Sequence, residues 1–538
     1  MDRIKEYRSL AASILLLLLL VGGAMAVSIN HNDGHLIYAL DDPYIHMSMA
    51  KNFVRHGVLG VTPYGFSSSS SSPLWLSILI GVYTVFGVGE LAPMILNVLA
   101  AIALLGIVHA VLRRLGLEEW SIAAVLISVI VFFPLPTIIF LGLEHIVHAC
   151  LSVAALYLAA RALSADAGDT KGSRALTWLL VLTPLLAAIR YEGALLAGMI
   201  ALLLLLRRRY LPAFLVPILA ALPIVIYGLI SRSHGWLFFP NPILLKGNLP
   251  SLGSFGGIVR FFRDGFYLQL IHNSHMQVLL LLLACGAVAT LRRGAGVWSR
   301  EVMMIAIATG TVMLHLQFAG IGWFHRYEAY LIAMALVALA PLVRELLAGI
   351  SARSGVAVRL AGVFMLIIGA LPFLHRGLKV MVTPRATANI YQQQYQMGLF
   401  LARYYPGASV AANDIGAITF LGDIHLLDTW GLGSLEPALM KRAGTYTIDT
   451  VARLCASRGV KLAIVYDSWL RELGGMPPSW TRVGMWTIPQ NVVCGDSTVS
   501  FYAVDPSERD SLVQRLRAFA PSLPGEVRQE GEYRPGRE

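Results

Sequence analysis

Two adjacent aspartates open a short polar segment in which acid–base chemistry is possible. Asp41 and Asp42 stand in the sequence Leu-Asp-Asp-Pro-Tyr, an order typical of a helix start. A helix start explains one acid as the N-cap and the other as a charge that offsets the helix dipole. It does not explain two acids beside an apolar stripe, which Ile45, Met49 and Phe53 form at a spacing of four. A carboxylate there can take a proton from a hydroxyl group, or hold a cation against a phosphate.

Further charges occur in short turns between apolar stretches. They are Glu144, Arg190, Glu192, Arg326 and Glu328. Charges at the edge of an apolar bundle are costly and are usually functional. The alternative is structural, because an arginine–glutamate pair can tie two helices together. The turn 190–193 lies between short apolar runs, so we expect it to dip into the membrane and to line a polar cavity.

Apolar helices must position these charges. Of the 538 residues, 57% are hydrophobic and 14% are charged, whereas a soluble globular chain carries about 25% charge. A helix needs about 20 apolar residues to cross the hydrocarbon core of a membrane. The apolar runs lie at residues 10–29, 73–89, 91–112, 120–141, 145–163, 175–190, 193–206, 211–231, 275–291, 302–321, 328–347 and 357–375. We expect about eleven of them to cross. The run 73–89 is short and begins Ser-Pro, which favours a re-entrant or interfacial helix instead.

The basic residues predict the orientation of these helices. The net charge of +11 is spread over short loops between the apolar runs, and such loops face the cytoplasm under the positive-inside rule. The charge therefore gives no reason to expect nucleic acid as a partner. The rule predicts a cytoplasmic N-terminus and an extracytoplasmic C-terminus. We interpret the first run as an uncleaved anchor because it is long, although Ala24-Met25-Ala26 resembles a signal-peptide cleavage site.

The composition divides the chain in two near residue 375. Residues 1–375 are predicted to form the membrane domain, with 30–72 as the first outer loop, and residues 376–518 an extracytoplasmic α/β domain. Its short strands are predicted at 409–412, 425–428, 461–467, 483–488 and 499–504, and its amphipathic helices at 447–457 and 507–518. Residues 519–538 are polar and are expected to be disordered. Cys455 and Cys494 both fall in this domain, where oxidising conditions allow a disulfide.

Short motifs also run through the chain in a particular order. They are Asp41-Asp42-Pro43-Tyr44 followed by Ala50-x-Asn52, Gly57-x-x-Gly60 and Ser71-Ser72-Pro73-Leu74-Trp75; Gly142-Leu143-Glu144; Arg190-Tyr191-Glu192-Gly193; Pro240-Asn241-Pro242 with Lys246; Arg326-Tyr327; Asn413-Asp414-Ile415-Gly416; and Asp428-Thr429-Trp430-Gly431-Leu432. The ordered set, over about residues 10–435, resembles the GT-C class of membrane glycosyltransferases. It is most similar to the bacterial branch that includes mycobacterial arabinofuranosyltransferases and relatives of protein mannosyltransferases. Tyr191 stands where that branch has proline, and Pro242 where it has threonine.

The resemblance implies a polytopic, GT-C-like fold and a glycosyl transfer. A hexose or pentose would pass from a polyprenyl-phosphate donor to a glycan, lipid or protein acceptor at the outer face of a bacterial plasma membrane. An acid of the first outer loop serves this class as the base, or as a metal ligand in some members. We therefore expect Asp41 to be the base and Asp42 its helper, although capping by Asp41 would leave Asp42 as the freer acid. The residues expected to bind the donor phosphate and sugar are Arg190, Lys246, Arg326, Glu144, Glu192, Tyr44, Tyr191 and Asn241.

Two other functions stay open. A transporter or flippase for lipid-linked sugars would show inverted repeats and charges deep in the membrane, whereas here the acids gather at one face. A non-catalytic envelope assembly protein would use its C-terminal domain to bind a partner. A divalent cation stays possible as a cofactor, although Asp41-Asp42 is not the Asp-x-Asp pattern of metal sites. For an enzyme, the charged turns should meet in one cavity beneath the first outer loop.

Overall fold

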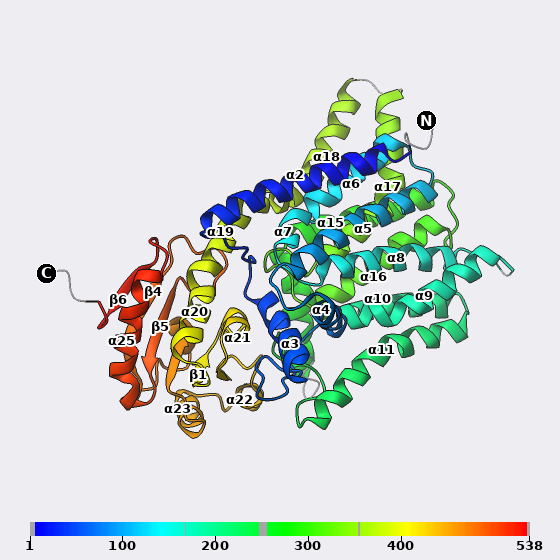
Figure 1. Cartoon of the computed structure of the whole chain (residues 1–538). Helices are drawn as coiled ribbons and strands as arrows, with labels where there is room; N and C mark the ends of the chain where they lie inside the picture. Colours follow the sequence, from blue (N-terminus) through cyan, green and yellow to red (C-terminus); the bar gives the residue numbers. More distant parts are fainter. Residues whose placement is uncertain (1–5, 167, 247–254, 353–355, 535–538) are drawn as a thin grey trace.

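A bundle of apolar helices lies beside a mixed β-sheet in the computed structural model (Figure 1). The structure describes residues 6–166, 168–246, 255–352 and 356–534. The N-terminal end of the first helix lies at the end of the bundle far from the sheet (Figure 1). The last described strand, β6 (Arg528–Gly531), lies on the side of the sheet far from the bundle (Figure 1).

The helical part contains long apolar helices and several short ones. Its elements are α2 (Arg8–His31), α3 (Asp42–His56), α4 (Pro73–Phe86), α5 (Ala92–Arg114), α6 (Glu119–Phe132), α7 (Leu135–Ile139), α8 (His145–Leu163), α9 (Thr170–Ile189), α10 (Gly193–Leu206), α11 (Tyr210–Ser233), α12 (Asn241–Lys246), α13 (Phe255–Phe262), η1 (Arg263–Tyr267), α14 (Leu268–His272), α15 (Ser274–Arg292), α16 (Arg300–Phe318), α17 (Ala329–Ala352), α18 (Val356–Gly377) and α19 (Lys379–Ile390). The predicted run 120–141 is divided between α6 and α7, because prolines at 134 and 136 interrupt the helical hydrogen bonding.

Seven of these helices, within the described residues, are long and apolar enough to cross a membrane. They are α2, α5, α8, α9, α11, α15 and α16. Shorter apolar stretches occur in α4, α6, α10 and residues Ala329–Arg344 of α17. The chain is therefore a multi-pass membrane protein. The expected total of about eleven crossings, and the placement of 73–89, stay predictions.

The second part is an α/β domain built on a six-stranded sheet. Its elements are η2 (Tyr391–Tyr395), α20 (Gln396–Tyr404), β1 (Ser409–Ala412), α21 (Gly416–Leu421), β2 (His425–Asp428), α22 (Leu435–Ala443), α23 (Ile448–Ser457), β3 (Leu462–Val465), α24 (Asp467–Arg471), β4 (Thr481–Thr487), β5 (Thr498–Ala503), η3 (Pro506–Glu508), α25 (Arg509–Phe519), η4 (Ala520–Ser522) and β6 (Arg528–Gly531). The strand order is β2-β1-β3-β5-β4-β6. β1 pairs in parallel with β2 and β3, and the other pairings are antiparallel. The five strands predicted from the sequence are confirmed.

The predicted disordered tail is wrong over most of its length. β6 pairs with β4 from Gly484↔Gly531 to Thr487↔Arg528, and Tyr533 is completely buried. The Arg-Gln-Glu-Gly segment has no apolar alternation because it is an edge strand, whose side chains need little burial. Residues 535–538 lie outside the described part of the chain.

The disulfide predicted between Cys455 and Cys494 is not formed, and both are free thiols. Cys455 packs with Ala411 and Ala463, which face one side of the sheet. Cys494 packs with the residues of the other face and donates a hydrogen bond to Gln394 Oε1 at 3.3 Å. Successive residues of a strand point to opposite faces, so the two thiols are separated by the sheet.

Helix α3 connects the sheet domain to the bundle. It packs between α4 of the bundle and α21 of the α/β domain (Figure 1). Lys51 Nζ donates hydrogen bonds to the carbonyl oxygens of Phe420 at 2.6 Å and Thr419 at 3.0 Å, near the end of α21. The first outer loop is therefore fixed against both parts of the molecule.

Candidate active site

The charged turns predicted from the sequence meet at a cavity of about 480 Å³ beneath α3. The cavity is bounded by α3, the turn before α8, the α9–α10 turn, α12, the loop before α17 and the loop after β2. Its polar lining is formed by Asp42, His46, Ser69, Ser71, Glu144, His145, Arg190, Tyr191, Glu192, Arg326 and Tyr327. Its apolar lining includes Ile45, Leu143, Leu195, Ile224, Ile243 and Phe318. One cavity thus offers both ionic groups and a hydrophobic wall.

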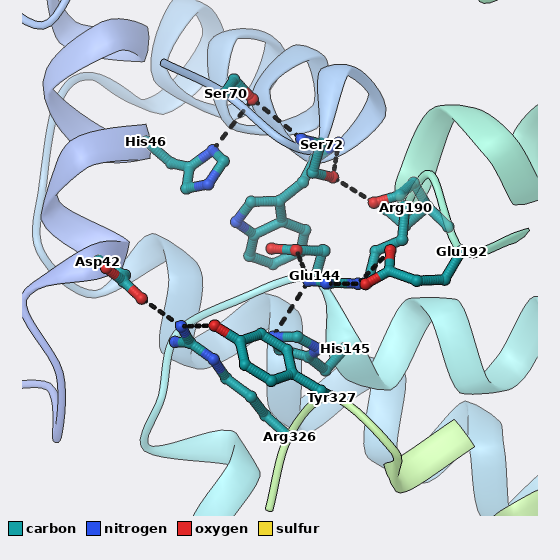
Figure 2. A network of polar contacts seen from close by, with 12 residues as sticks. Asp42, His46, Ser70, Ser72, Glu144, His145, Arg190, Glu192, Arg326 and Tyr327 are labelled. Atoms are coloured by element: carbon teal, nitrogen blue, oxygen red, sulfur yellow. Dashed lines mark hydrogen bonds and ion pairs between the residues drawn. The ribbon is translucent and has the colours of Figure 1, made fainter. Parts of the chain in front are cut away.

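Asp42 and Arg326 form an ion pair at this cavity (Figure 2). Arg326 Nη2 also donates a hydrogen bond to Tyr327 Oη at 3.0 Å, and the guanidinium lies 4.9 Å from the centre of the Tyr327 ring. The side chain of Asp42 is 28% exposed, whereas that of Arg326 is only 4% exposed. The buried Nε and Nη1 atoms of Arg326 have no hydrogen-bond partner within the described part of the chain. Arg326 therefore offers two buried N–H-bearing nitrogens to an anion.

The loop that holds Arg326 has an unusual backbone. Trp323, Phe324 and His325 have φ values of +45°, +62° and +60°, in the left-handed region that residues with a side chain rarely adopt. Strain of this kind persists only where the surroundings fix it, and it is common at functional sites. Arg376 of α18 donates a hydrogen bond to the carbonyl of His325 at 2.8 Å, which holds the loop in this conformation.

Arg190 is paired with both predicted glutamates (Figure 2). Arg190 Nη1 lies 2.6 Å from Glu144 Oε1, and Arg190 Nη2 lies 2.5 Å from Glu192 Oε1. Its guanidinium also lies 5.6 Å from the centre of the Tyr327 ring, so that this ring contacts both arginines. The side chains of Arg190 and Glu144 are 8% and 2% exposed. The geometry at this turn matches the structural interpretation of an Arg–Glu pair.

Removal of Arg190 is expected to destabilise the protein more than removal of an exposed arginine. Arg190→Ala leaves two buried carboxylates without their cation, which should lower the free energy of unfolding by about 3–5 kcal/mol. Arg113→Ala is the matched control, because Arg113 pairs with Glu6 and Glu119 but is 35% exposed, and surface pairs contribute about 0–1 kcal/mol. Both can be measured by unfolding in detergent. If Arg190→Ala is as stable as the parent but no longer uses the donor, Arg190 binds the donor phosphate instead of holding the helices together.

Asp41 points away from the cavity. Its Oδ2 and Oδ1 atoms accept hydrogen bonds from the backbone N–H groups of Gly416 at 2.6 Å and Ala417 at 2.8 Å. Asp41 is the N-cap residue of α3 by position, but its carboxylate makes no capping hydrogen bond there. The expectation that Asp41 caps its own helix is therefore wrong, because its side chain caps α21. A Cβ on Gly416 would lie 2.1 Å from the Asp41 carbonyl oxygen, so this contact requires glycine.

The stability of the protein is expected to fall as the pH rises through the range in which Asp41 ionises. Burial and the neighbouring Asp414 raise the pKa of Asp41 to about 8, against the two backbone N–H groups that lower it. Between about pH 4 and pH 8 the folded protein thus keeps a proton that the unfolded chain has released, and each increase in pH weakens folding.

Asp41→Asn should reduce the dependence of stability on pH. It should also lower stability at every pH, because asparagine has one acceptor oxygen for the two N–H groups of Gly416 and Ala417. Thermal unfolding from pH 5 to pH 8 measures the effect. Asp449→Asn, at an exposed position of α23, is the control and should keep the parental slope. The same slope in Asp41→Asn and the parent would show that Asp41 does not hold the proton.

The other predicted site residues divide into those at the cavity and those elsewhere. Tyr191 lines the cavity, and its hydroxyl is buried without a hydrogen-bond partner among the described residues. Tyr44 is fully buried and packs against Tyr38, outside the cavity lining. Asn241 donates hydrogen bonds to the carbonyls of Gly431 at 2.8 Å and Ser434 at 3.3 Å, which joins α12 to the loop after β2. The side chain of Lys246 lies outside the described part of the chain.

Glu328 is also separate from the cavity. It forms an ion pair with Arg376 in which both side chains are 0% exposed, and it accepts a hydrogen bond from the backbone N–H of Gly322 at 2.9 Å. Glu328 therefore holds α18 and the loop before α17 together. The expectation that all the outer charges converge on one site is correct for Glu144, Arg190, Glu192 and Arg326 only.

Several cavity residues were not predicted. His46 lies one helical turn after Asp42, and its Nδ1 atom is 3.5 Å from Ser70 Oγ (Figure 2). The consecutive serines at 67–72 form a largely buried segment. Ser69 Oγ donates a hydrogen bond to Leu432 O at 2.8 Å, and Ser72 Oγ donates one to Ile189 O at 2.5 Å. The spacing of four between Asp42 and His46 is a signal in the sequence that places both on one helix face.

The carboxylates of the cavity are already matched with arginines. Within the described ranges, no group of three or more His, Cys, Asp or Glu side chains is close enough to hold a metal ion. Asp42 pairs with Arg326, and Glu144 and Glu192 pair with Arg190. Among the described residues, two arginines therefore balance most of the negative charge of the three carboxylates of the cavity.

Comparison with known proteins gives a match to one family model and to several solved structures. The model is described as a domain of unknown function, DUF8728, and matches residues 388–502, which cover most of the α/β domain. A search of curated protein sequences gives no match.

Solved membrane enzymes share the fold over nearly the whole chain. ArnT from Cupriavidus metallidurans, solved bound to undecaprenyl phosphate, has a TM-score of 0.52 at 13% identity, over 91% of this chain and 98% of that one. The oligosaccharyltransferase of Archaeoglobus fulgidus, tethered with an acceptor peptide, has a TM-score of 0.51 at 11% identity, over 92% of this chain and 74% of that one. Its apo form gives a TM-score of 0.52 at 12% identity, over 94% and 75% of the two chains. The chain has the GT-C-like fold that its sequence motifs predict.

Proposed function

We propose that this protein is a glycosyltransferase that moves a sugar from a polyprenyl-phosphate donor to an acceptor at the outer face of the membrane. The observation that carries the proposal is the Asp42–Arg326 pair at the cavity, where two buried guanidinium nitrogens have no hydrogen-bond partner in the described ranges. A carboxylate and an anion-binding arginine side by side are the groups that this transfer needs. The likeness in fold to ArnT, which was solved bound to undecaprenyl phosphate, supports the choice of donor.

Each part of the cavity has a role in the proposed reaction. Arg326 holds the donor phosphate through Nε and Nη1, which places the leaving group next to Asp42. The Asp42 carboxylate accepts the proton of the acceptor hydroxyl. At the same time the oxygen of that hydroxyl forms a bond to the anomeric carbon of the sugar. The bond between that carbon and the phosphate oxygen breaks, and polyprenyl phosphate leaves with the electron pair. The apolar wall of the cavity, including Ile45 and Phe318, contacts the lipid chain.

The proposed orientation puts the α/β domain outside the cell. The arginines of the predicted cytoplasmic loops gather at one end of the bundle, where Arg161 pairs with Asp169 at 2.9 Å and Arg209 donates to Ala165 O at 2.5 Å. The α/β domain is at the opposite end of the bundle (Figure 1). Positive loops on the inside therefore leave the cavity and the domain at the outer face.

A direct test is to incubate the purified protein with a panel of polyprenyl-phosphate hexoses and pentoses. Release of polyprenyl phosphate, dependent on the protein, is the expected result. The Asp42→Asn variant is the control for contaminating enzymes, because it differs at one atom of the proposed base. Absence of release from every donor, or movement of the intact lipid-linked sugar between the leaflets of a vesicle, would contradict the proposal. The second outcome would assign the protein to the flippases.

A further inference from the structure

A second cavity, of about 440 Å³, lies in the α/β domain at the ends of its parallel strands. Asn413 follows β1, Trp430 follows β2, and Trp469 lies on α24, which follows β3. These three strands are adjacent and parallel, in the order β2-β1-β3. In α/β sheets, ligands bind outside the carboxyl ends of parallel strands. The position of the cavity is therefore that of a binding site, separate from the Asp42–Arg326 pair.

Two indole rings form a rigid aromatic surface in this cavity. The ring centres of Trp430 and Trp469 are 4.7 Å apart, with an angle of 54° between the ring planes. The backbone N–H of Trp430 donates to Asp428 Oδ1 at 2.7 Å, which fixes the start of the loop. Trp469 packs against Tyr466, and a Cβ on Gly495 would lie 2.5 Å from the Trp469 ring, so the chain passes directly against its edge. Neither ring needs to be ordered by a ligand.

Polar groups accompany the two rings. The amide oxygen of Asn413 is a buried acceptor without a hydrogen-bond partner in the described part of the chain, and the residue is only 6% exposed. Lys441 Nζ lies 3.6 Å from the centre of the Trp430 ring and donates to Trp430 O at 2.8 Å. Glu472 is exposed at the rim. A purely apolar ligand would leave the Asn413 oxygen without a hydrogen bond, whereas a hydroxyl group would satisfy it.

Indole faces combined with an amide, an ammonium and a carboxylate match the chemistry of a sugar. A pyranose or furanose presents C–H groups that pack on an aromatic face, and hydroxyl groups that donate to a carbonyl oxygen such as that of Asn413. Small-molecule sites in proteins have this composition, with aromatic walls and a few placed polar groups.

The second cavity also shares a wall with the proposed active site. Leu245 of α12 lines the second cavity, while Pro242 and Ile243 of the same helix line the first. The loop after β2 is shared as well, since Trp430 faces the second cavity and Leu432 the first. A chain of sugars held on the two tryptophans can therefore extend past α12 toward Asp42.

We propose that this cavity binds a sugar residue of an oligosaccharide acceptor, so that the α/β domain holds a glycan whose end is extended at Asp42. The inference rests on the proposed glycosyltransferase function and narrows its acceptor class to a carbohydrate chain. It also gives the domain matched by the DUF8728 model a role as the acceptor-binding part of the enzyme.

The test measures binding without any donor, so that it does not depend on catalysis. The full-length protein in lipid nanodiscs is titrated calorimetrically with hexasaccharides of arabinan, mannan, galactan and glucan, and with a serine- and threonine-rich decapeptide. At least one hexasaccharide should bind. Trp469→Ala and Asn413→Ala should each raise its Kd roughly tenfold or more, which corresponds to the loss of one good contact. Trp469→Phe keeps a ring and should recover part of the affinity.

Arg471→Ala is the matched control, because Arg471 lies on the same short helix as Trp469 but is exposed and outside the cavity. It should leave the Kd unchanged. Binding of no hexasaccharide, binding that is equal in the parent and all cavity variants, or binding of the peptide alone would each overturn the inference. Release of polyprenyl phosphate from the donor panel is measured in parallel, with the hexasaccharides present, so that a glycan hydroxyl or water can take the sugar. Release with no glycan binding would refute the acceptor site only, whereas glycan binding with no release would refute the proposed transfer.

Discussion

Replacement of Asp42 by asparagine is expected to lower the rate of sugar transfer by about 10²–10⁴-fold, the usual effect of losing a general base. Asparagine has nearly the shape of aspartate and still accepts a hydrogen bond from Arg326, but it cannot take the proton of the acceptor hydroxyl. The helix start should tolerate the change, because Asp42 lies in the first turn of α3 and loss of its charge there costs only about 0.3–1 kcal/mol. Turnover is measured as polyprenyl phosphate release in the presence of acceptor, and folding as the unfolding midpoint.

Asp41→Asn is the matched control for this variant. The two aspartates are adjacent, yet only Asp42 lines the cavity, while Asp41 accepts hydrogen bonds from the start of α21. Asp41→Asn should therefore lose much less activity than Asp42→Asn, because it keeps the cavity carboxylate and removes only one of the two hydrogen bonds that position it. The sequence motif alone favours Asp41 as the base. If Asp41→Asn loses activity and Asp42→Asn does not, that first assignment is right and the role proposed here for Asp42 is wrong.

Truncation of Arg326 should weaken use of the donor by roughly ten- to more than a hundred-fold, because a charge-assisted hydrogen bond contributes about 1.5–3 kcal/mol. Arg326→Ala removes the two buried nitrogens that have no partner among the described residues, so the loss should appear as a higher KM for the polyprenyl-phosphate sugar. Arg326→Lys keeps the charge but not the planar pair of donors, and should recover only part of the effect.

Arg232→Ala is the control for a simple loss of positive charge, because Arg232 is exposed at the end of α11. It should leave the KM for the donor unchanged. The unfolding midpoint of Arg326→Ala separates phosphate binding from a structural effect, since its partner Asp42 is 28% exposed and can be solvated. If Arg326→Ala has the same KM for the donor as the parent, Arg326 does not bind the donor phosphate.

The fold was largely predictable because its signals are local. Runs of apolar residues indicate the long helices, and the apolar segments around Ala411, Leu427 and Ile464 indicate the strands β1, β2 and β3. β6 gave no such signal, because an edge strand with the sequence Arg-Gln-Glu-Gly depends on its partner β4 rather than on buried side chains. The disulfide prediction was wrong for a related reason. Composition indicates that Cys455 and Cys494 share a domain, but not that they lie on opposite faces of its sheet.

The site was predictable in its residues but not in their partners. The charge of Arg190 is visible in the sequence, but its pairing with Glu144 depends on how the α9–α10 turn meets the start of α8. The contact between Asp41 and Gly416 joins residues that are 375 positions apart, and no periodicity encodes it. His46 was missed because a single histidine on an amphipathic helix is ordinary until the neighbouring serines are placed beside it. Sequence patterns indicate the helices and strands, whereas the contact partner of each site side chain depends on tertiary packing.

The contact between Asp41 and the start of α21 has a consequence for the order in which the molecule is made. Asp42 follows Asp41 directly, so the position of the cavity acid depends on backbone groups at Gly416 and Ala417. A ribosome adds about 5–20 residues per second, so these groups emerge roughly 20 to 75 seconds after Asp41, since the two positions are 375 residues apart. During that interval the bundle can insert while α3 lacks the helix that holds its first turn. Asp42 therefore reaches its fixed position only late in biosynthesis, and a chain that terminates before Gly416 carries Asp42 in the membrane without the contacts that hold it.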